Sequence, residues 1–260
     1  MGVVNVTPDS FSDGGRFHDP AAALAHARRL IADGADLLDI GGESTRPGAE
    51  PVSEREELAR VLPLIRALAP ECPVPISIDT AKPAVARAAV GAGAAIWNDV
   101  TALRGAPDSL DVAAALGCEV VLMHMRGEPR TMQDAPRYGD VVAEVEAFLL
   151  ARAEAAMAAG VRRERIWLDP GIGFGKTLAH NLALIRNLAR LRRHGFCVLL
   201  GASRKRSIAA LDPRATSPDA RLGGSLAFAL RGAAEGVDAV RVHDVFETVQ
   251  ALRVWSALQG

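Results

Sequence analysis

Short runs of apolar residues alternate along this chain with longer stretches in which apolar positions recur every three or four residues. The short runs are rich in Val, Ile and Leu and predict β-strands, whereas the longer stretches predict amphipathic helices. The predicted strands cover residues 2–6, 36–40, 75–78, 95–98, 119–123, 165–168, 197–200 and 238–242. Helical spacing is clearest at residues 20–33, 53–68, 83–91 and 141–159.

Eight alternations of strand and helix predict an α/β fold of the (β/α)₈ TIM-barrel class. The runs 37–40 and 198–200 are nearly all apolar, as in strands that are covered by helices on one side and by barrel interior on the other. A doubly wound parallel sheet is the structural alternative. No linker or low-complexity tract divides the chain, so residues 1–260 are predicted to form a single domain. Because the first predicted strand begins at residue 2, we expect the floor of the barrel to be open or trimmed.

Polar residues and glycines follow every predicted strand. In a barrel of parallel strands the carboxyl ends meet at one face, where active sites are built. Those ends carry Asn5, the segment 39–48, Asp79 and Thr80, Asn98 and Asp99, the segment 123–125, the segment 169–176, the segment 201–205 and the segment 241–244. A single Asp after a strand most simply caps the following helix. Eight polar strand ends together predict a functional site.

Two kinds of functional group meet at these ends. The carboxylates of Asp79 and Asp169 and the amide of Asn98 suit the NH and NH₂ edge of a nitrogen heterocycle. The other group suits phosphate oxygens and a hard cation such as Mg²⁺. It consists of Arg46, Lys205, Arg241 and His243, with Asn5 as a neutral oxygen ligand. The sequence therefore predicts a heterocyclic substrate that carries a phosphate or diphosphate.

The segment 5–15 is predicted to leave the first strand as a polar loop. Pro8 cannot continue a central strand, and the Asp-Gly-Gly sequence at 13–15 favours turns. Phe11 is a large apolar residue in this polar setting, which is explained if it swings in over a second substrate. Residues 7–15 are therefore predicted to form a mobile lid, with a simple surface turn as the alternative.

Several familiar motifs are excluded. The segment 171–177 ends in Gly-Lys-Thr like a phosphate-binding P-loop, but Pro170 stands where that motif needs a glycine, and a GxGxxG pattern is also missing. Its glycines are instead expected to let the backbone pass close to a flat ligand. No HExxH pattern occurs, and of the six histidines only His124 and His243 fall at strand ends.

Composition narrows the class of protein. A formal net charge of -1 gives no indication of nucleic acid or an anionic membrane as a partner. Three widely spaced cysteines suggest neither a disulfide framework nor a zinc ribbon, which fits a reducing compartment. No run approaches 18 consecutive apolar residues, and the first residues do not resemble a signal peptide. We therefore expect a cytoplasmic protein.

Taken together, the motifs resemble those of the dihydropteroate synthase family. They are NVTPDSFSDGG, DIGGESTRPG, SIDT, WNDV, MHMRGEPRTMQ, DPGIGFGKT, GASRK and VRVHDV, and the match runs from residue 2 to about 254. The resemblance implies a folate-pathway transferase that joins 4-aminobenzoate to 6-hydroxymethyl-7,8-dihydropterin diphosphate through a cationic pterin intermediate, releasing 7,8-dihydropteroate and diphosphate. It also implies a pterin-binding TIM barrel, a Mg²⁺ cofactor, competition by sulfonamides and a homodimer.

The resemblance further implies roles for individual residues. The pterin would be bound by Asp39, Asp79, Asn98, Met123, Asp169, Phe174, Gly201 and Lys205. The 4-aminobenzoate site would comprise Phe11, Thr45, Arg46, Pro47 and Ser203. Diphosphate would be held by Asn5, Thr45, Arg46, Arg241 and His243, with Asn5 also binding the metal. Asp79, Asp169, Lys205, Arg241 and His243 are the expected catalytic residues. The one departure from the family is the segment that usually precedes the first strand, since Met1 and Gly2 here lead directly into it.

Three other functions stay open at this point. A pterin-dependent methyltransferase that uses methyltetrahydrofolate would share the Asp and Asn pocket, but it has no use for a diphosphate grip at 203–205 and 241–243. A Schiff-base aldolase would use Lys205 as its nucleophile. An inactive paralogue would keep the barrel and act only as a binding partner.

Overall fold

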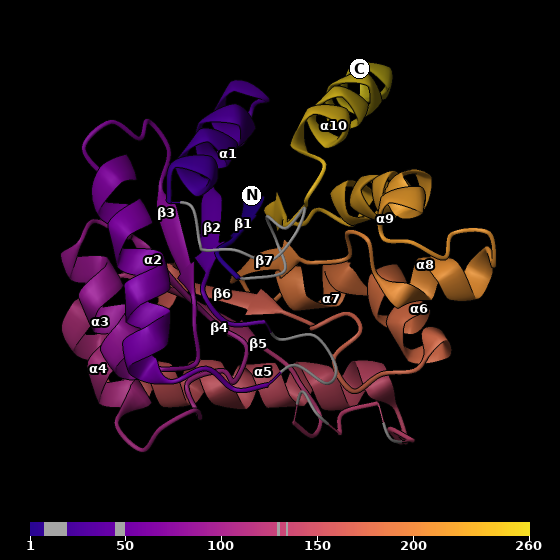
Figure 1. The fold of residues 1–260 in the computed structure, drawn as a ribbon. Helices are drawn as coiled ribbons and strands as arrows, with labels where there is room; N and C mark the ends of the chain where they lie inside the picture. Colours follow the sequence, from indigo (N-terminus) through magenta and orange to yellow (C-terminus); the bar gives the residue numbers. More distant parts are fainter. Residues whose placement is uncertain (8–19, 45–49, 129–130, 134) are drawn as a thin grey trace.

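Eight parallel strands form one sheet whose order follows the sequence, β1 to β8, in a computed structural model (Figure 1). The structure describes residues 1–7, 20–44, 50–128, 131–133 and 135–260. The strands are β1 Gly2–Asn5, β2 Leu38–Gly41, β3 Ile76–Asp79, β4 Ile96–Asp99, β5 Glu119–Met123, β6 Ile166–Asp169, β7 Cys197–Leu200 and β8 Ala239–Val240. Each lies within two residues of its predicted position, except that the regular part of β8 is shorter.

The sheet closes on itself, which distinguishes a barrel from a doubly wound sheet. Gly2 forms a parallel bridge with Val242, just beyond β8. The backbone N–H of Val3 donates to the carbonyl of Val242 at 3.0 Å, so β1 and the end of β8 are neighbours. The predicted (β/α)₈ fold is therefore confirmed.

Helices surround the strands (Figure 1). They are α1 Pro20–Ala32, α2 Glu54–Leu68, α3 Pro83–Gly91, α4 Ser109–Leu116, α5 Val141–Ala158, α6 Leu178–Arg186, α7 Leu188–Arg192, α8 Arg206–Leu211, α9 Leu222–Ala234 and α10 Val245–Gln259, with short 3₁₀ turns at Arg163–Arg165 and Asp219–Arg221. The four helices predicted most clearly all form. Their starts have local causes, since the Ser53 hydroxyl caps α2, the Asp140 carboxylate caps α5, and Pro83 begins α3.

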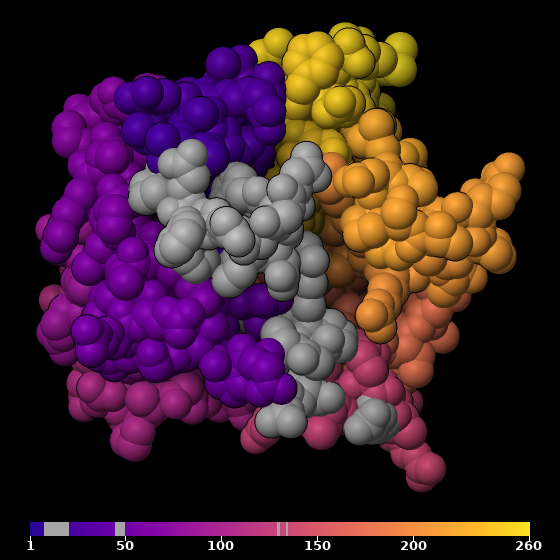
Figure 2. All heavy atoms as spheres, viewed as in Figure 1, coloured from indigo at the N-terminus to yellow at the C-terminus, as the bar shows by residue number. Residues whose placement is uncertain are grey.

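The first and last strands of the chain adjoin where the barrel closes, and the first and last helices pack beside them. Helices α1 and α10 lie on the same side of the molecule (Figure 1). A side chain added at Gly2 would touch Leu30 of α1 and Val245 of α10, both at 3.1 Å, so the backbone of β1 is packed closely against both helices. In Figure 2 the indigo region of the chain borders the yellow region at the top of the view.

Alternate residues of each strand face opposite sides of the barrel wall. One set packs with the helices in the main hydrophobic core and includes Leu38, Ile78, Leu122 and Leu168. The other set forms a separate apolar cluster that fills the barrel interior and consists of Met1, Leu37, Ile96, Val121, Trp167, Leu199 and Ala239. No helix in the described part of the chain is long and apolar enough to span a membrane.

Candidate functional site

The polar residues of the barrel mouth occupy the interior-facing positions directly above the apolar cluster. Two residues beyond Leu37, Ile96, Val121, Trp167, Leu199 and Ala239 come Asp39, Asn98, Met123, Asp169, Gly201 and Arg241. Because the side-chain period of a strand is two, these six residues point to the same side of the wall as the apolar cluster. Strand pairing also places Asp79 next to Asn98, and Met123 next to Asp169.

Arg241 joins the acidic residues of this ring. Its Nε lies 2.5 Å from Asp39 Oδ2, and its Nη2 lies 2.8 Å from Asp79 Oδ2. Asn98 Nδ2 donates to the same Asp39 oxygen at 3.2 Å. Asp39 is fully buried, and its Oδ1 has no hydrogen-bond partner among the described residues. The sequence placed Arg241 with the diphosphate ligands, whereas the structure shows its guanidinium held between two carboxylates of the predicted pterin pocket.

Burial sets the protonation of this cluster. Desolvation raises the pKa of Asp79 to about 7, although the positive charge of Arg241 acts in the opposite direction. The nearby charge of Asp39 adds to the increase. Desolvation acts to lower the pKa of Arg241, but Asp39 and Asp79 outweigh it and leave that pKa raised. Arg241 is therefore always charged, while Asp79 can exchange a proton near neutral pH.

On the opposite side of the mouth, Asp169 and Lys205 accompany an apolar surface. Asp169 Oδ1 accepts the N–H of Gly171 at 2.7 Å, and burial raises the pKa of this carboxyl. The Lys205 ammonium lies 4.3 Å from the centre of the Phe174 ring, within the range of a cation–π contact. Phe174 packs in turn against a small cluster of Val100, Met123, Met125 and Met132. This side of the mouth therefore combines the Lys205 ammonium with an apolar surface of one aromatic ring and several methionine side chains.

Lys176 holds the loop that carries Phe174, a role that the sequence did not reveal. Its side chain is buried, and its Nζ lies 2.9 Å from His124 Nδ1, 2.9 Å from the carbonyl of Gly171 and 3.0 Å from that of Phe174. Burial lowers the pKa of Lys176 to about 7, and burial together with Lys176 lowers that of His124 to about 3. His124 is therefore a neutral acceptor for Lys176. One feature of the sequence could have indicated this contact: His124 stands at a strand end, and Lys176 belongs to a glycine-rich segment that follows the next strand.

The glycines of this loop serve a different contact from the expected one. A side chain at Gly171 would meet the carbonyl oxygen of His124 at 2.0 Å, and one at Gly175 would meet that of Arg126 at 2.2 Å. Both residues also have positive φ, at +67° and +64°. The sequence predicted a close approach to a flat ligand, but at these two positions the loop approaches the protein's own backbone.

Ser203 and His243, which the sequence assigned to separate subsites, are in contact. Ser203 Oγ accepts the backbone N–H of His243 at 3.2 Å and lies 3.0 Å from its Nδ1. Burial, followed by the charge of Arg241, lowers the pKa of His243 to about 3, so the ring is neutral. Because Ser203 Oγ accepts the backbone N–H of His243, the serine hydroxyl can donate its own hydrogen bond to Nδ1 of the neutral ring. Nε2 then carries the hydrogen.

Asp99 has a local role, but it is not the predicted cap of the following helix, since Asp108 stands at the start of α4. Asp99 Oδ1 accepts both the N–H and the hydroxyl of Thr101 at 2.7 Å, and its Oδ2 accepts the N–H of Leu103 at 2.9 Å. These bonds hold the turn that places Val100 in the apolar cluster. Asp99 therefore supports the site from outside the mouth.

Two further predicted residues lie at strand ends. Asn5 ends β1 and is half-buried at the mouth, and Gly201 follows β7. Phe11, Thr45, Arg46 and Pro47 lie outside the described residues, as does most of the predicted lid, residues 8–15. Within the described part of the chain, no group of three or more His, Cys, Asp or Glu residues is arranged to hold a metal ion.

Known proteins are similar in sequence to this chain over nearly its whole length. The sequence profile described as "Pterin binding enzyme" matches residues 1–243. The dihydropteroate synthase of Escherichia coli strain K12 is 48% identical over 257 residues, covering 99% of this chain and 90% of that protein. That of Neisseria meningitidis serogroup B is 50% identical over 265 residues, covering 99% and 92%.

Solved structures agree. The dihydropteroate synthase of Xanthomonas albilineans with 4-aminobenzoic acid has a TM-score of 0.94 and 54% identity, covering 100% of this chain and 92% of that one. The Yersinia pestis enzyme in a sulfonamide drug complex has a TM-score of 0.94 and 46% identity, covering 100% and 93%. With a barrel whose polar mouth is formed by the matching motifs, the chain belongs to the pterin-binding enzymes, in the dihydropteroate synthase family.

Proposed function

We propose that this chain condenses 6-hydroxymethyl-7,8-dihydropterin diphosphate with 4-aminobenzoate to give 7,8-dihydropteroate and diphosphate. The observation that carries the proposal is the polar ring at the barrel mouth, in which Asp39 binds both Asn98 and Arg241, and Arg241 also binds Asp79. This ring is formed by the motifs shared with the dihydropteroate synthases.

The polar ring fits the polar edge of a pterin, and the apolar surface opposite the ring fits the flat faces of the pterin. The polar edge of a pterin carries NH and NH₂ donors and a carbonyl, which the carboxylates of Asp79 and Asp169 and the amide of Asn98 complement. Its flat faces fit between Met123, Phe174 and the guanidinium of Arg241. The buried Asp39 Oδ1, which has no partner among the described residues, offers one further acceptor.

The reaction needs no activated nucleophile. The bond between the pterin methylene carbon and the diphosphate oxygen breaks, and its electron pair leaves with the diphosphate. The resulting cation is delocalised over the pterin ring, where ionised Asp79 and Asp169 stabilise positive charge. The amine nitrogen of 4-aminobenzoate then attacks the methylene carbon and loses a proton to solvent.

The departing diphosphate gains negative charge, and its proposed ligands include cationic and N–H groups at the β8 end. Arg241 supplies a fixed positive charge, and neutral His243 supplies the N–H of Nε2. Lys205 adds a second cation near the pterin and the leaving group. Arg46 and Thr45 complete the proposed diphosphate grip.

Mg²⁺ is the proposed cofactor, and the donor set at the mouth fits a loosely held ion. Mg²⁺ commonly keeps several waters and binds through one or two protein oxygens together with substrate phosphates. Asn5 offers one amide oxygen of this type at the tip of β1. When bound, the ion neutralises charge on the diphosphate, which makes it a better leaving group.

The second substrate site is proposed on Phe11, Thr45, Arg46, Pro47 and Ser203. Support comes from relatives, since the Xanthomonas albilineans structure contains 4-aminobenzoic acid and the Yersinia pestis structure contains a sulfonamide drug. Sulfonamides are therefore proposed to compete with 4-aminobenzoate. The contact between Ser203 and His243 supports a 4-aminobenzoate site that adjoins the proposed diphosphate grip.

We also propose a cytoplasmic homodimer. Phe246, Val254 and Leu258 of α10 are exposed by 56%, 57% and 78%, and they recur at intervals of eight and four residues along one face. An exposed apolar stripe of this kind suits contact with a second subunit. Sedimentation velocity of the purified chain tests the assembly.

The decisive experiment is incubation of purified protein with the pterin diphosphate and Mg²⁺, with and without 4-aminobenzoate, followed by chromatography of the products. We expect dihydropteroate and one equivalent of diphosphate only when both substrates are present. A failure to form dihydropteroate would favour the methyltransferase, which methyl transfer from methyltetrahydrofolate to a corrinoid protein would reveal, or the inactive paralogue. Borohydride trapping of a carbonyl substrate on Lys205 would instead indicate an aldolase.

A further inference from the structure

Arg204 has an unusual backbone conformation at the centre of the proposed site. Its φ is +57°, in the left-handed region that residues with a side chain rarely adopt. Among the described residues only three other non-glycine residues have positive φ: Ala102, Leu103 and Ala135. Arg204 stands directly between Ser203 and Lys205, both of which belong to the predicted site. Strain held at such a place suggests a role in function.

The backbone of Arg204 is held on both sides. Its N–H donates to Ser225 Oγ at 2.9 Å, and its carbonyl accepts Arg221 Nη1 at 2.9 Å. Arg221 is itself buried and donates to the carbonyls of Ala215 and Thr216. The start of α9 and the turn before it therefore fix the peptide groups of Arg204 from outside the barrel.

The Arg204 side chain forms a second attachment. Its Nε lies 3.0 Å from Asp244 Oδ2 and its Nη2 lies 2.5 Å from Asp244 Oδ1, so the pair is bidentate. Its Nη1 contacts Asp219 Oδ1 at 2.7 Å, but that carboxylate is 83% exposed. The inner contact with Asp244 is therefore the stronger restraint.

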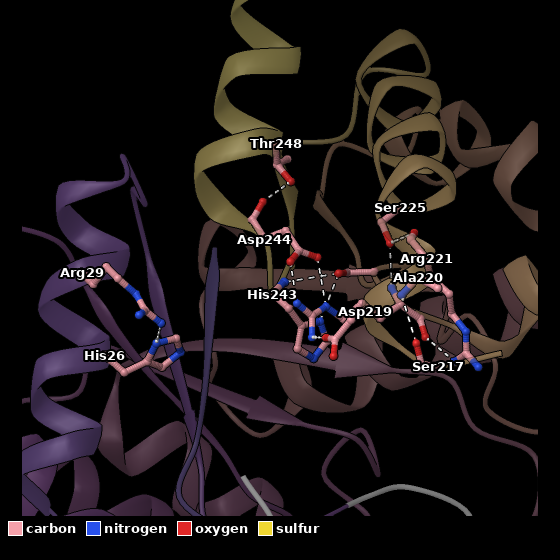
Figure 3. A network of polar contacts seen from close by, with 12 residues as sticks. His26, Arg29, Ser217, Asp219, Ala220, Arg221, Ser225, His243, Asp244 and Thr248 are labelled. Carbon is pink, nitrogen blue, oxygen red and sulfur yellow. Dashed lines mark hydrogen bonds and ion pairs between the residues drawn. The ribbon is translucent and has the colours of Figure 1, made fainter. Parts of the chain in front are cut away.

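Two adjacent contacts thus join the ends of β7 and β8. Ser203 meets His243, and the next residue in each loop, Arg204, meets Asp244. In Figure 3, His243 and Asp244 lie below the start of α10, with Asp219, Arg221 and Ser225 beside them. Because the strained residue lies between Ser203 and Lys205, its conformation sets the directions in which their two side chains leave the chain.

We propose that Arg204 is a positioning residue, whose left-handed conformation, held by Asp244, Ser225 and Arg221, aims Ser203 at His243 and Lys205 at Phe174. The guanidinium itself faces the Asp244 and Asp219 carboxylates. The inference rests on the proposed function, because it assigns Ser203 and Lys205 to the binding of the two substrates. The competing roles for Arg204 are a direct contact with substrate and a contribution to fold stability alone.

A substitution series at residue 204 separates these three roles. Glycine adopts the left-handed region freely, asparagine tolerates it, alanine is strained there, and valine is the most strained. We expect kcat/KM to fall in the order Arg204→Gly, Arg204→Asn, Arg204→Ala, Arg204→Val. The cost of a left-handed alanine corresponds to a loss of about 5–30-fold, whereas the glycine variant should stay within about threefold of wild type.

Each variant is assayed for dihydropteroate formation at a temperature where circular dichroism shows it fully folded, with KM measured for both substrates. Asp219→Ala is the matched control, since it removes only the exposed contact and should stay within about twofold of wild type. If the glycine variant were as impaired as alanine, the side chain and not the left-handed backbone conformation would be what matters, and the inference would be wrong. Equal kcat/KM across the folded variants would show that residue 204 affects stability alone.

The activity of the wild-type protein distinguishes a failure of this inference from a failure of the proposed function. If the wild-type protein formed no dihydropteroate, the proposed function would be wrong. The order of the variants could still be measured as their affinities for 4-aminobenzoate and a pterin, by calorimetry. An active wild type with variants in the wrong order would overturn only the inference.

Discussion

Two charge clusters in this barrel have the same arrangement of charges but different surroundings. In each, one cation lies between two carboxylates. Arg241 lies 2.5 Å from Asp39 and 2.8 Å from Asp79. Lys82 lies 2.5 Å from Glu43 and 2.6 Å from Glu57, which is fully buried. Each cluster also leaves one buried oxygen, Asp39 Oδ1 or Glu57 Oε1, without a partner in the described part of the chain.

The surroundings decide what each cluster does. The cluster of Lys82 lies outside the barrel wall, between the ends of β2 and β3 and helix α2, and it binds the chain itself. Glu43 Oε1 accepts the N–H of Val52 at 2.9 Å, and the side chain of Glu57 packs against Gly42. The cluster of Arg241 faces the interior, above the apolar layer and beside Asn98. In this barrel, a buried ion pair indicates a functional site when its residues occupy interior-facing positions of the strands at the barrel mouth.

The largest expected effect is on turnover, at the interior cluster. Asp79→Asn or Lys205→Ala should reduce dihydropteroate formation by about 10³-fold, because each removes a charge that faces the pterin. The fold should stay intact, as measured by circular dichroism and thermal melting. Asp219→Asn, at an exposed acid, is the control and should change turnover little. Near-normal turnover of either purified variant would refute the assignment of the pocket.

The next effect is on stability, at the exterior cluster. Lys82→Met should lower the free energy of unfolding by about 3 kcal/mol, because it leaves the buried Glu57 carboxylate without its cation. Urea denaturation measures the change. Adding Glu57→Gln should recover part of the loss, since the buried charge is then also removed. If the double variant were less stable than Lys82→Met, the unpaired charge would not be the cause.

A smaller effect is expected in the pH dependence of stability. Since burial raises the pKa of Asp79 from 3.8 to about 7, the folded state holds a proton between these values that the unfolded state has lost. The contribution of this group is therefore present at low pH and lost as pH rises to 7. Relative to Asp79→Asn, wild type should lose on the order of 2–3 kcal/mol between pH 5 and pH 8. Parallel urea midpoints for the two proteins would contradict the raised pKa.

The smallest effect should come from the exposed edge of the exterior cluster. Glu56 pairs with Arg60 one turn along α2, and its side chain is 54% exposed. Glu56→Ala should therefore cost about 0.5 kcal/mol or less, and the cost should shrink further in high salt. A loss as large as that of Lys82→Met would show that Arg60 and Lys82 act as one network.

The order of residues along the chain was enough to predict the strands, the barrel and which of the described residues lie at its mouth. Apolar periods of two and of three to four residues are local properties, so the strands and helices followed from them. Parallel strands bring their carboxyl ends to one face, so the polar residues after each strand could be assigned to one site. The motifs then identified the family.

Which of these residues contact each other depends on the folded chain. Arg241 meets Asp39 and Asp79 from 202 and 162 positions away, and no spacing in the sequence indicates that contact. His124 and Asp99 stand at strand ends like the site residues, yet they support a loop and a turn. Whether a polar side chain meets a ligand or its own chain depends on the few ångströms that separate neighbouring loops. Those distances are set by the closure of the barrel as a whole.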